Sequence, residues 1–200
     1  MKGSLIIVGF FVLGTICGVC HLLPFDIAET NISYYALCAL MFSVGLSVGN
    51  DPQTLKNFRS LNPRLVFLPI MTILGTLAGS AAVSLILTHR SITDCLAVGS
   101  GFGYYSLSSI FITEYKGAEL GTIALLANIS REILTLLAAP LLVRWFGNLA
   151  PISAGGATTM DTTLPIITRT AGQQFVVVSI FHGFVVDFSV LFLVTLFCSI

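Results

Sequence analysis

Long apolar segments dominate this sequence and leave little choice of fold. Seven of them follow one another along the chain, at 4–23, 34–48, 65–88, 96–112, 120–143, 150–167 and 175–197. A helix needs about 20 mostly apolar residues to cross the hydrocarbon core of a bilayer. Only 9% of the residues are charged, whereas soluble domains carry about 25%. We therefore predict an all-α polytopic membrane protein with about seven membrane segments, forming one transmembrane domain over residues 1–200.

The charges and cysteines exclude several classes of function. Nine basic and nine acidic residues give a net charge of zero, so no basic patch is available for nucleic acid. Five cysteines, an odd number in a mostly apolar chain, do not suggest a disulfide framework. The sequence shows no Cys, His and Asp cluster with metal-ligand spacing and no phosphate-binding loop. We predict no metal, no cofactor and no nucleic-acid partner; the bilayer itself is the expected surrounding.

Lysine and arginine predict the orientation, because they are retained on the cytoplasmic side during insertion. If the loop after the second segment is cytoplasmic, six of these residues lie inside and two, Arg90 and Arg144, lie outside. The six are Lys2, Lys56, Arg59, Arg64, Lys116 and Arg169. This places the N-terminus in the cytoplasm and the C-terminus in the periplasm. The first segment has no signal-peptidase site of the A-x-A kind, so we interpret it as a retained span.

The fourth and sixth segments contain residues that interrupt helices. Residues 99–109 read Gly-Ser-Gly-Phe-Gly-Tyr-Tyr-Ser-Leu-Ser-Ser, and residues 151–165 hold two prolines, paired glycines and an aspartate. We predict that both segments are broken or re-entrant. Irregular backbone at membrane depth is tolerated only inside protein or beside water, and a pair of broken segments is typical of a transporter's binding site. Close packing of small residues between helices is the alternative interpretation.

Four charged residues lie near the middle of three segments. Arg131 and Glu132 lie at the centre of 120–143, Asp161 near the centre of 150–167, and Asp187 next to the centre of 175–197. A charge at this depth costs about 2.5–3.5 kcal/mol on insertion scales, which marks such residues as functional candidates. Pairing with Arg131 is the structural alternative, but one arginine cannot neutralise three acids. Together they predict proton-coupled cation transport, with Asn128 on the Glu132 face of its helix.

Three motifs resemble one known family. They are Gly-Phe-Gly-Tyr-Tyr-Ser-Leu-Ser-Ser at 101–109, Ala-Asn-Ile-Ser-Arg-Glu at 127–132 and Gly-Gly-Ala-Thr-Thr-Met-Asp-Thr-Thr-Leu-Pro at 155–165. From about Phe42 to the C-terminus, the chain resembles the LysO family of bacterial lysine exporters. The resemblance implies export of L-lysine, and of analogues such as thialysine, across the inner membrane against protons. It also implies that Glu132 and Asp161 match two acids that export requires.

The resemblance extends to the expected site and partners. Members of the family typically carry a further N-terminal portion, so the chain resembles the larger part of a split exporter. This implies a small separate membrane subunit, with a homo-oligomer as a further possibility. Lysine also has a carboxylate, for which we expect broken-helix N-termini near 99–103 and 155–156 to supply N–H groups. The candidate contacts there are Gly101, Gly103, Ser106, Ser108, Gly155, Gly156, Thr158 and Thr159.

Other functions are compatible with the same residues. A cation-selective channel could use the acids as a selective ring. A non-transporting subunit could use the midplane charges only to bind a partner helix. An enzyme is disfavoured, because the sequence offers no recognisable pairing of a nucleophile with a base. We therefore predict a single transmembrane transporter domain without enzymatic activity.

Overall fold

The computed structural model describes residues 12–14, 16–20, 42, 46, 63–87 and 89–200. The chain divides into two compact units, residues 1–59 and residues 60–200. In the first unit, residues 12–14 and 16–19 are helical. The predicted segments at 4–23 and 34–48 lie largely outside the described residues. The single domain over 1–200 stays a prediction.

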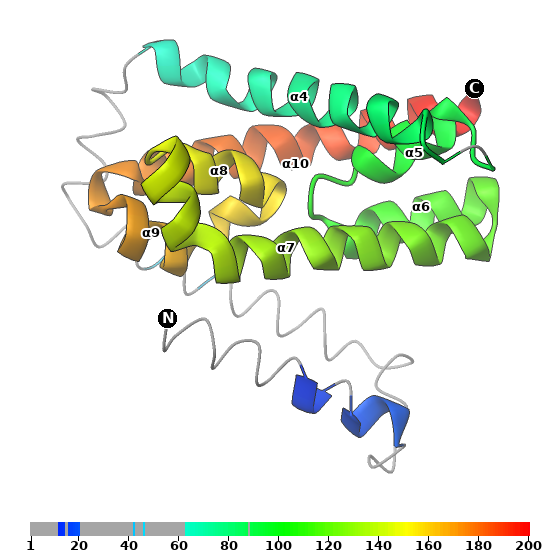
Figure 1. The fold of residues 1–200 in the computed structure, drawn as a ribbon, viewed down its shortest axis with the longest axis horizontal. Coiled ribbons are helices and arrows are strands. Elements are labelled where there is room, and N and C mark those ends of the chain that lie inside the picture. The colour runs from blue at the N-terminus through cyan, green and yellow to red at the C-terminus, as the bar shows by residue number, and fades with distance from the viewer. Residues whose placement is uncertain (1–11, 15, 21–41, 43–45, 47–62, 88) are drawn as a thin grey trace. The chain divides into compact units, whose positions relative to one another are not determined.

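Every regular element described in the second unit is helical, which confirms the all-α prediction for this part of the chain (Figure 1). The order is η2 (Pro63–Val66), α4 (Phe67–Ser84), α5 (Ile92–Gly99), α6 (Tyr105–Lys116), α7 (Ala118–Phe146), α8 (Ala150–Gly155), η3 (Gly156–Met160), α9 (Leu164–Ala171), η4 (Gln173–Phe175) and α10 (Val176–Ser199). Elements labelled η are 3₁₀ helices.

Three of these helical stretches are long and apolar enough to cross a membrane. They are Phe67–Ser84, Ala118–Phe146 and Gln173–Ser199, and they match the third, fifth and seventh predicted segments. The longest, α7, has 29 residues and spans roughly 44 Å at 1.5 Å per residue. Glycines with positive φ, Gly117 and Gly147, flank it and end the helical run at either side. The full count of seven segments stays a prediction.

The fourth and sixth segments are interrupted, as their composition predicts. In the fourth, α5 ends at Gly99 and α6 begins at Tyr105. Between them the backbone turns through two residues with positive φ, Phe102 at 45° and Gly103 at 95°. In the sixth, Gly156 has a φ of 65° and separates α8 from the 3₁₀ turn η3. Whether either segment re-enters or crosses the membrane stays a prediction.

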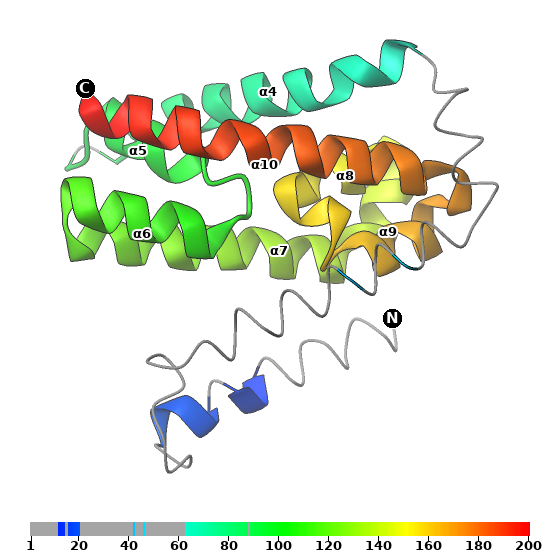
Figure 2. The same cartoon turned by 180° about the vertical axis from the view of Figure 1, so that it is seen from behind.

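The broken segments lie end to end along the bundle, between the long helices α4, α7 and α10 (Figures 1 and 2). Each pair of short helices packs on its own apolar cluster. The cluster beside α5 and α6 includes Phe102, Ile112 and Val190, and the cluster beside α8 and α9 includes Ile152 and Ile167. The buried apolar residues of both interruptions, Phe102 and Ala157, belong to the first of these clusters.

Candidate functional site

The two interruptions touch each other. The Ala157 N–H donates to the Phe102 carbonyl oxygen at 2.9 Å. The approach is so close that a Cβ on Gly156 would lie 2.1 Å from that oxygen. A Cβ on Gly103 would lie 3.1 Å from the Gly155 oxygen. We call residues 100–104 and 156–163, which form this contact, the crossover. Glycine is required at position 156 by both space and its positive φ.

Asn128 on α7 supports the first half of the crossover. Its Oδ1 accepts a hydrogen bond from the Gly103 N–H at 2.8 Å. Its Nδ2 donates to the Val98 oxygen at 3.2 Å, at the end of α5, and to the Ala124 oxygen at 2.9 Å. The residue is buried. The bond from the Gly103 N–H satisfies a buried backbone donor that the broken helix leaves without a helical partner.

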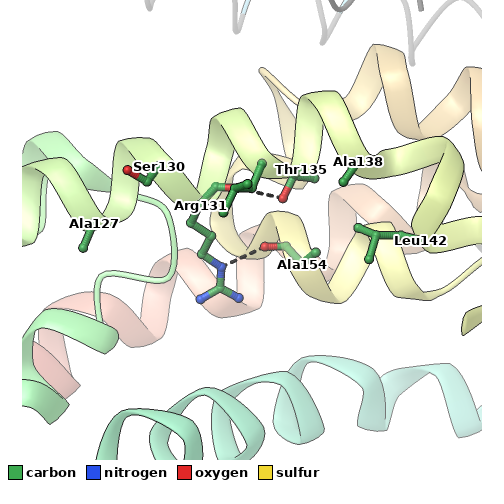
Figure 3. Close-up of a pocket in the computed structure, with 8 residues that line it drawn as sticks. Ala127, Ser130, Arg131, Thr135, Ala138, Leu142 and Ala154 are labelled. Atoms are coloured by element: carbon green, nitrogen blue, oxygen red, sulfur yellow. Dashed lines mark hydrogen bonds between the residues drawn. The ribbon is translucent and has the colours of Figure 1, made fainter. Parts of the chain in front are cut away.

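Arg131, one helical turn further along α7, supports the second half. Its Nε donates to the Ala154 oxygen at 2.8 Å (Figure 3). Its Nη2 donates to the Ser153 oxygen at 3.0 Å. Both carbonyls belong to α8, whose C-terminal end carries the negative pole of the helix dipole. In the described part of the chain, Arg131 forms no ion pair with a carboxylate. The structural alternative, in which Arg131 pairs with the midplane acids, is therefore not what the structure shows.

The glycines of both segments lie where one helix ends and the next begins. Gly155 is the last residue of α8 and Gly156 follows it, while Gly99 ends α5. In the fourth segment the second helix begins at Tyr105; in the sixth, η3 begins at Gly156 and α9 begins at Leu164. Gly99 and Gly155 thus end the first helix of each segment, and the positive φ of Gly103 and Gly156 turns the chain just after these ends. The binding of a substrate carboxylate by N–H groups near 99–103 and 155–156 stays a prediction.

Most of the predicted hydroxyl contacts are used within the protein. Ser108 donates to the Tyr104 oxygen at 2.8 Å. Thr158 donates to the Gly155 oxygen at 2.9 Å, and Thr159 donates to the Gly156 oxygen at 2.8 Å. All three donors are buried, whereas Ser106 on α6 is exposed. Gly101 is buried against Asn128. These residues shape the crossover, and their role as substrate contacts stays a prediction.

The three midplane acids are brought together from three elements. Glu132 on α7 lies in the electrostatic field of Asp161 in the crossover, and Asp187 on α10 does so as well. We call these three residues the acidic cluster. None of them forms an ion pair with a described Lys, Arg or His. No set of three His, Cys, Asp or Glu side chains among the described residues is arranged to hold a metal ion.

Polar neighbours that the sequence did not single out complete the acidic cluster. Thr162 lies near the carboxyls of both Glu132 and Asp161. Its Oγ1 and the Asp187 Oδ1 are buried without a hydrogen-bond partner in the described structure. Tyr104 and Tyr105 lie in the field of the acids. Thr162 and both tyrosines belong to the motifs that carry the family resemblance, and this was the available signal.

His182 is packed and hydrogen-bonded. It is fully buried on α10. Its Nε2 lies 3.0 Å from Thr72 Oγ1 on α4, and its Nδ1 lies 3.2 Å from Thr159 Oγ1 in the crossover. Thr72 in turn donates to Ser153 Oγ on α8 at 3.0 Å. One side chain thus links α4 and α10 to the crossover.

Comparisons with known proteins agree with the resemblance found in the sequence. The family described as lysine exporter LysO matches residues 8–198. Lysine exporter LysO of Escherichia coli (strain K12) is 36% identical over 196 residues, which cover 98% of this chain and 64% of the relative. A putative lysine exporter of Haemophilus influenzae is 34% identical over 184 residues, which cover 92% of this chain and 90% of the relative.

The chain therefore spans just under two thirds of the length of its Escherichia coli relative. No solved structure matches the chain. The match to the family nevertheless covers nearly the whole sequence, including both halves of the crossover and all three residues of the acidic cluster. The chain belongs to the family of the lysine exporter LysO, a family of membrane transport proteins.

Proposed function

We propose that this chain exports L-lysine, and analogues such as thialysine, across the bacterial inner membrane by exchange for protons. The names of its relatives support the substrate and the direction of transport. The observation that carries the mechanism is the acidic cluster, three carboxyl groups gathered beside an unwound backbone without a described basic partner. The proposal keeps the predicted orientation, with a cytoplasmic N-terminus and a periplasmic C-terminus.

The chemistry of lysine fits such a cluster. At neutral pH lysine carries two ammonium groups, and each can donate charge-assisted hydrogen bonds to a carboxylate. A proton and an ammonium group compete for the same carboxylate oxygens, and this competition couples the two flows. Glu132 and Asp161 are assigned the exchange of substrate and proton, with Asp187 as a third acceptor. Thr162, near the first two carboxyls, can donate to whichever of them is ionised.

The crossover gives the site both rigidity and a defined place. Asn128 and Arg131 hold the two interruptions from the same helix that carries Glu132. The unwound residues therefore keep a fixed relation to one acid while Asp161 lies within the unwound stretch itself. This fixed relation keeps Asp161 and Glu132 close enough to share one proton or one ammonium group. The two acids then bind either a proton or an ammonium group, and binding of one excludes the other.

The direct test is export from liposomes that contain the purified chain and are loaded with radiolabelled lysine. We expect Glu132→Gln and Asp161→Asn to reduce lysine efflux to the level of protein-free liposomes. Glu114→Gln is the matched control, because Glu114 is exposed near the end of α6, and its efflux should equal that of the unaltered protein. Unchanged efflux from the Glu132 and Asp161 variants would refute the assignment.

The same preparation separates the alternatives. A carrier shows saturable counterflow, whereas a cation-selective channel shows large conductance in planar bilayers. A non-transporting subunit would lose association with its partner, rather than efflux of its own, when Glu132 is replaced. The proposal includes a small membrane subunit or a second copy of the chain as a partner. Co-purification of a co-expressed small subunit, or the mass of the detergent-solubilised complex, tests that part.

A further inference from the structure

Arg131 forms part of the wall of a cavity that the acidic cluster does not share. The cavity is bounded by α4, α5 and α7 and has a volume of about 560 Å³, which falls within the roughly 300–1,000 Å³ typical of small-ligand pockets. Its wall is mostly apolar, with Thr76, Ser80, Asn128 and Arg131 among its polar residues. In Figure 3 the guanidinium extends from α7 toward α4, with its two Nη atoms on the side away from Ala154.

The charges of this cavity are unequally compensated. Three charged residues line it, Arg90, Asp94 and Arg131. Arg90 pairs with Glu119, and Asp94 lies 3.7 Å from the Lys116 ammonium nitrogen. The cavity therefore contains a positive charge, deep in a membrane helix, that has no carboxylate partner among the described residues. Its contacts there are two backbone carbonyls, one hydroxyl and the Phe102 ring, whose centre lies 5.9 Å from the guanidinium carbon.

The hydrogen bonds of Arg131 leave part of its donor capacity unused. A guanidinium has five N–H donors in a rigid fork. One on Nε and one on Nη2 bind the α8 carbonyls, and one on Nη1 approaches Thr76 Oγ1 at 3.4 Å. Two N–H groups, one on each Nη, have no partner in the described structure. Two such donors on one guanidinium match the two oxygens of a carboxylate.

Neighbouring positions on α7 separate this cation from the acids. Consecutive helical residues point about 100° apart, so Arg131 and Glu132 cannot face the same side of the helix. Arg131 contacts the α8 carbonyls and lines the cavity beside α4, while Glu132 lies near Thr162 and Asp161. The guanidinium carbon nevertheless lies next to the crossover, 3.3 Å from the place of a Cβ on Gly156.

We propose that Arg131 binds the carboxylate of the transported amino acid in this cavity and thereby selects amino acids over diamines. The inference rests on the proposed function and assigns only the side-chain ammonium group to the acidic cluster, because the α-ammonium shares a carbon with the carboxylate. Arg131 then has two tasks: it holds the end of α8 with Nε and one Nη2–H, and it offers its two remaining donors to the substrate. A diamine has the same two ammonium groups but no carboxylate, and so gains nothing from Arg131.

The test compares lysine with cadaverine, its analogue without the carboxylate, as ligands of the purified full chain in detergent. Binding is measured by the rise in unfolding temperature with ligand concentration. We expect the unaltered protein to bind lysine more tightly than cadaverine by roughly 10- to 100-fold, the value of a hydrogen bond to a charged group. Arg131→Gln should reduce this ratio to about one, chiefly by weakening lysine binding.

Two further variants and one control keep the result interpretable. Arg131→Lys retains the charge without the fork and should give an intermediate ratio, even if the glutamine variant does not fold. Asp161→Asn should weaken the binding of both ligands and leave the ratio of their affinities unchanged. Arg169→Gln removes an exposed arginine on α9 and should behave like the unaltered protein.

Three outcomes would overturn the proposal. If both Arg131 variants keep the preference for lysine, the carboxylate is bound elsewhere. If they lose lysine and cadaverine binding in equal proportion, Arg131 only holds α8 in place. If the unaltered protein binds neither ligand, the proposed function itself fails, and this inference fails with it. Loss of the ratio in the Arg131 variants, with its retention in Asp161→Asn, would support the carboxylate subsite.

Discussion

Replacing Gly156 by alanine is expected to destabilise the protein through the crossover. A Cβ at this position would lie 2.1 Å from the Phe102 oxygen and 3.1 Å from the Phe102 carbonyl carbon. Carbon and oxygen in contact do not approach this closely, so the two interruptions must move apart. The obstacle is backbone on both sides, which cannot rotate away as a flexible side chain can.

The expected loss follows from two effects. The backbone of Gly156 has φ 65° and ψ −127°, a region that is almost confined to glycine and costs a residue with a side chain about 1–3 kcal/mol. Separation of the interruptions also breaks the bond from the Ala157 N–H to the Phe102 oxygen. A buried donor left without a partner costs about 1–3 kcal/mol. Together the free energy of unfolding should fall by about 2–6 kcal/mol.

The measurement is reversible unfolding in detergent, followed by circular dichroism. Gly75→Ala is the matched control, because Gly75 lies in α4 and a Cβ there meets nothing within 4 Å. Alanine favours a helix by up to about 1 kcal/mol relative to glycine, so this control should be neutral or slightly stabilising. Equal stability of the Gly156 and Gly75 variants would refute the close contact between the interruptions.

Three further predictions follow from individual contacts. Asn128→Leu leaves the buried Gly103 N–H without its partner, so the unfolding free energy should fall by about 1–3 kcal/mol; an effect below about 0.5 kcal/mol would contradict the bracing role. His182→Ala removes the link between Thr72 and Thr159 and should lower the unfolding temperature, with partial recovery in His182→Gln. The Arg90–Glu119 pair is largely exposed on the glutamate side, so a double-mutant cycle should give at most about 1 kcal/mol, and less at high salt.

Composition was sufficient to locate the broken segments but not to orient their halves. Glycines and prolines at 99–103 and 151–165 predicted two interruptions, and the helices are broken there. The residue types alone do not predict where, relative to the glycines, the first helix ends and the second begins. That depends on where the backbone adopts positive φ, and here Gly103 and Gly156 do so before the second half begins.

For the charged residues, the sequence predicted the clustering of the acids but not the partners of Arg131. The spacing of Glu132, Asp161 and Asp187 along their segments predicted a common depth, and the fold brings them into one electrostatic cluster. The partners of Arg131 could not be predicted, because they are the carbonyl groups of residues 153 and 154. Every residue has such a carbonyl, so no sequence pattern marks the ones that the folded chain brings within reach.

The hydrogen bond between Thr72 and His182 could not be predicted from the sequence either. Thr72 lies in the middle of an apolar span without a flanking motif, and its partner His182 is 110 residues away. A single threonine in a membrane helix usually bonds to its own backbone. Only the packing of α4 against the crossover and α10 gives this hydroxyl a histidine partner.

The coupling of lysine export to proton movement is the central claim, and one measurement tests it most directly. Liposomes containing the purified chain and a trapped pH-sensitive dye are loaded with lysine and diluted into lysine-free buffer of equal pH. We predict that outward lysine flow drives protons inward, so that the interior becomes acidic, and that Glu132→Gln and Asp161→Asn abolish both flows together. Lysine efflux without acidification in the unaltered protein, or acidification that persists in both variants, would contradict exchange at the acidic cluster.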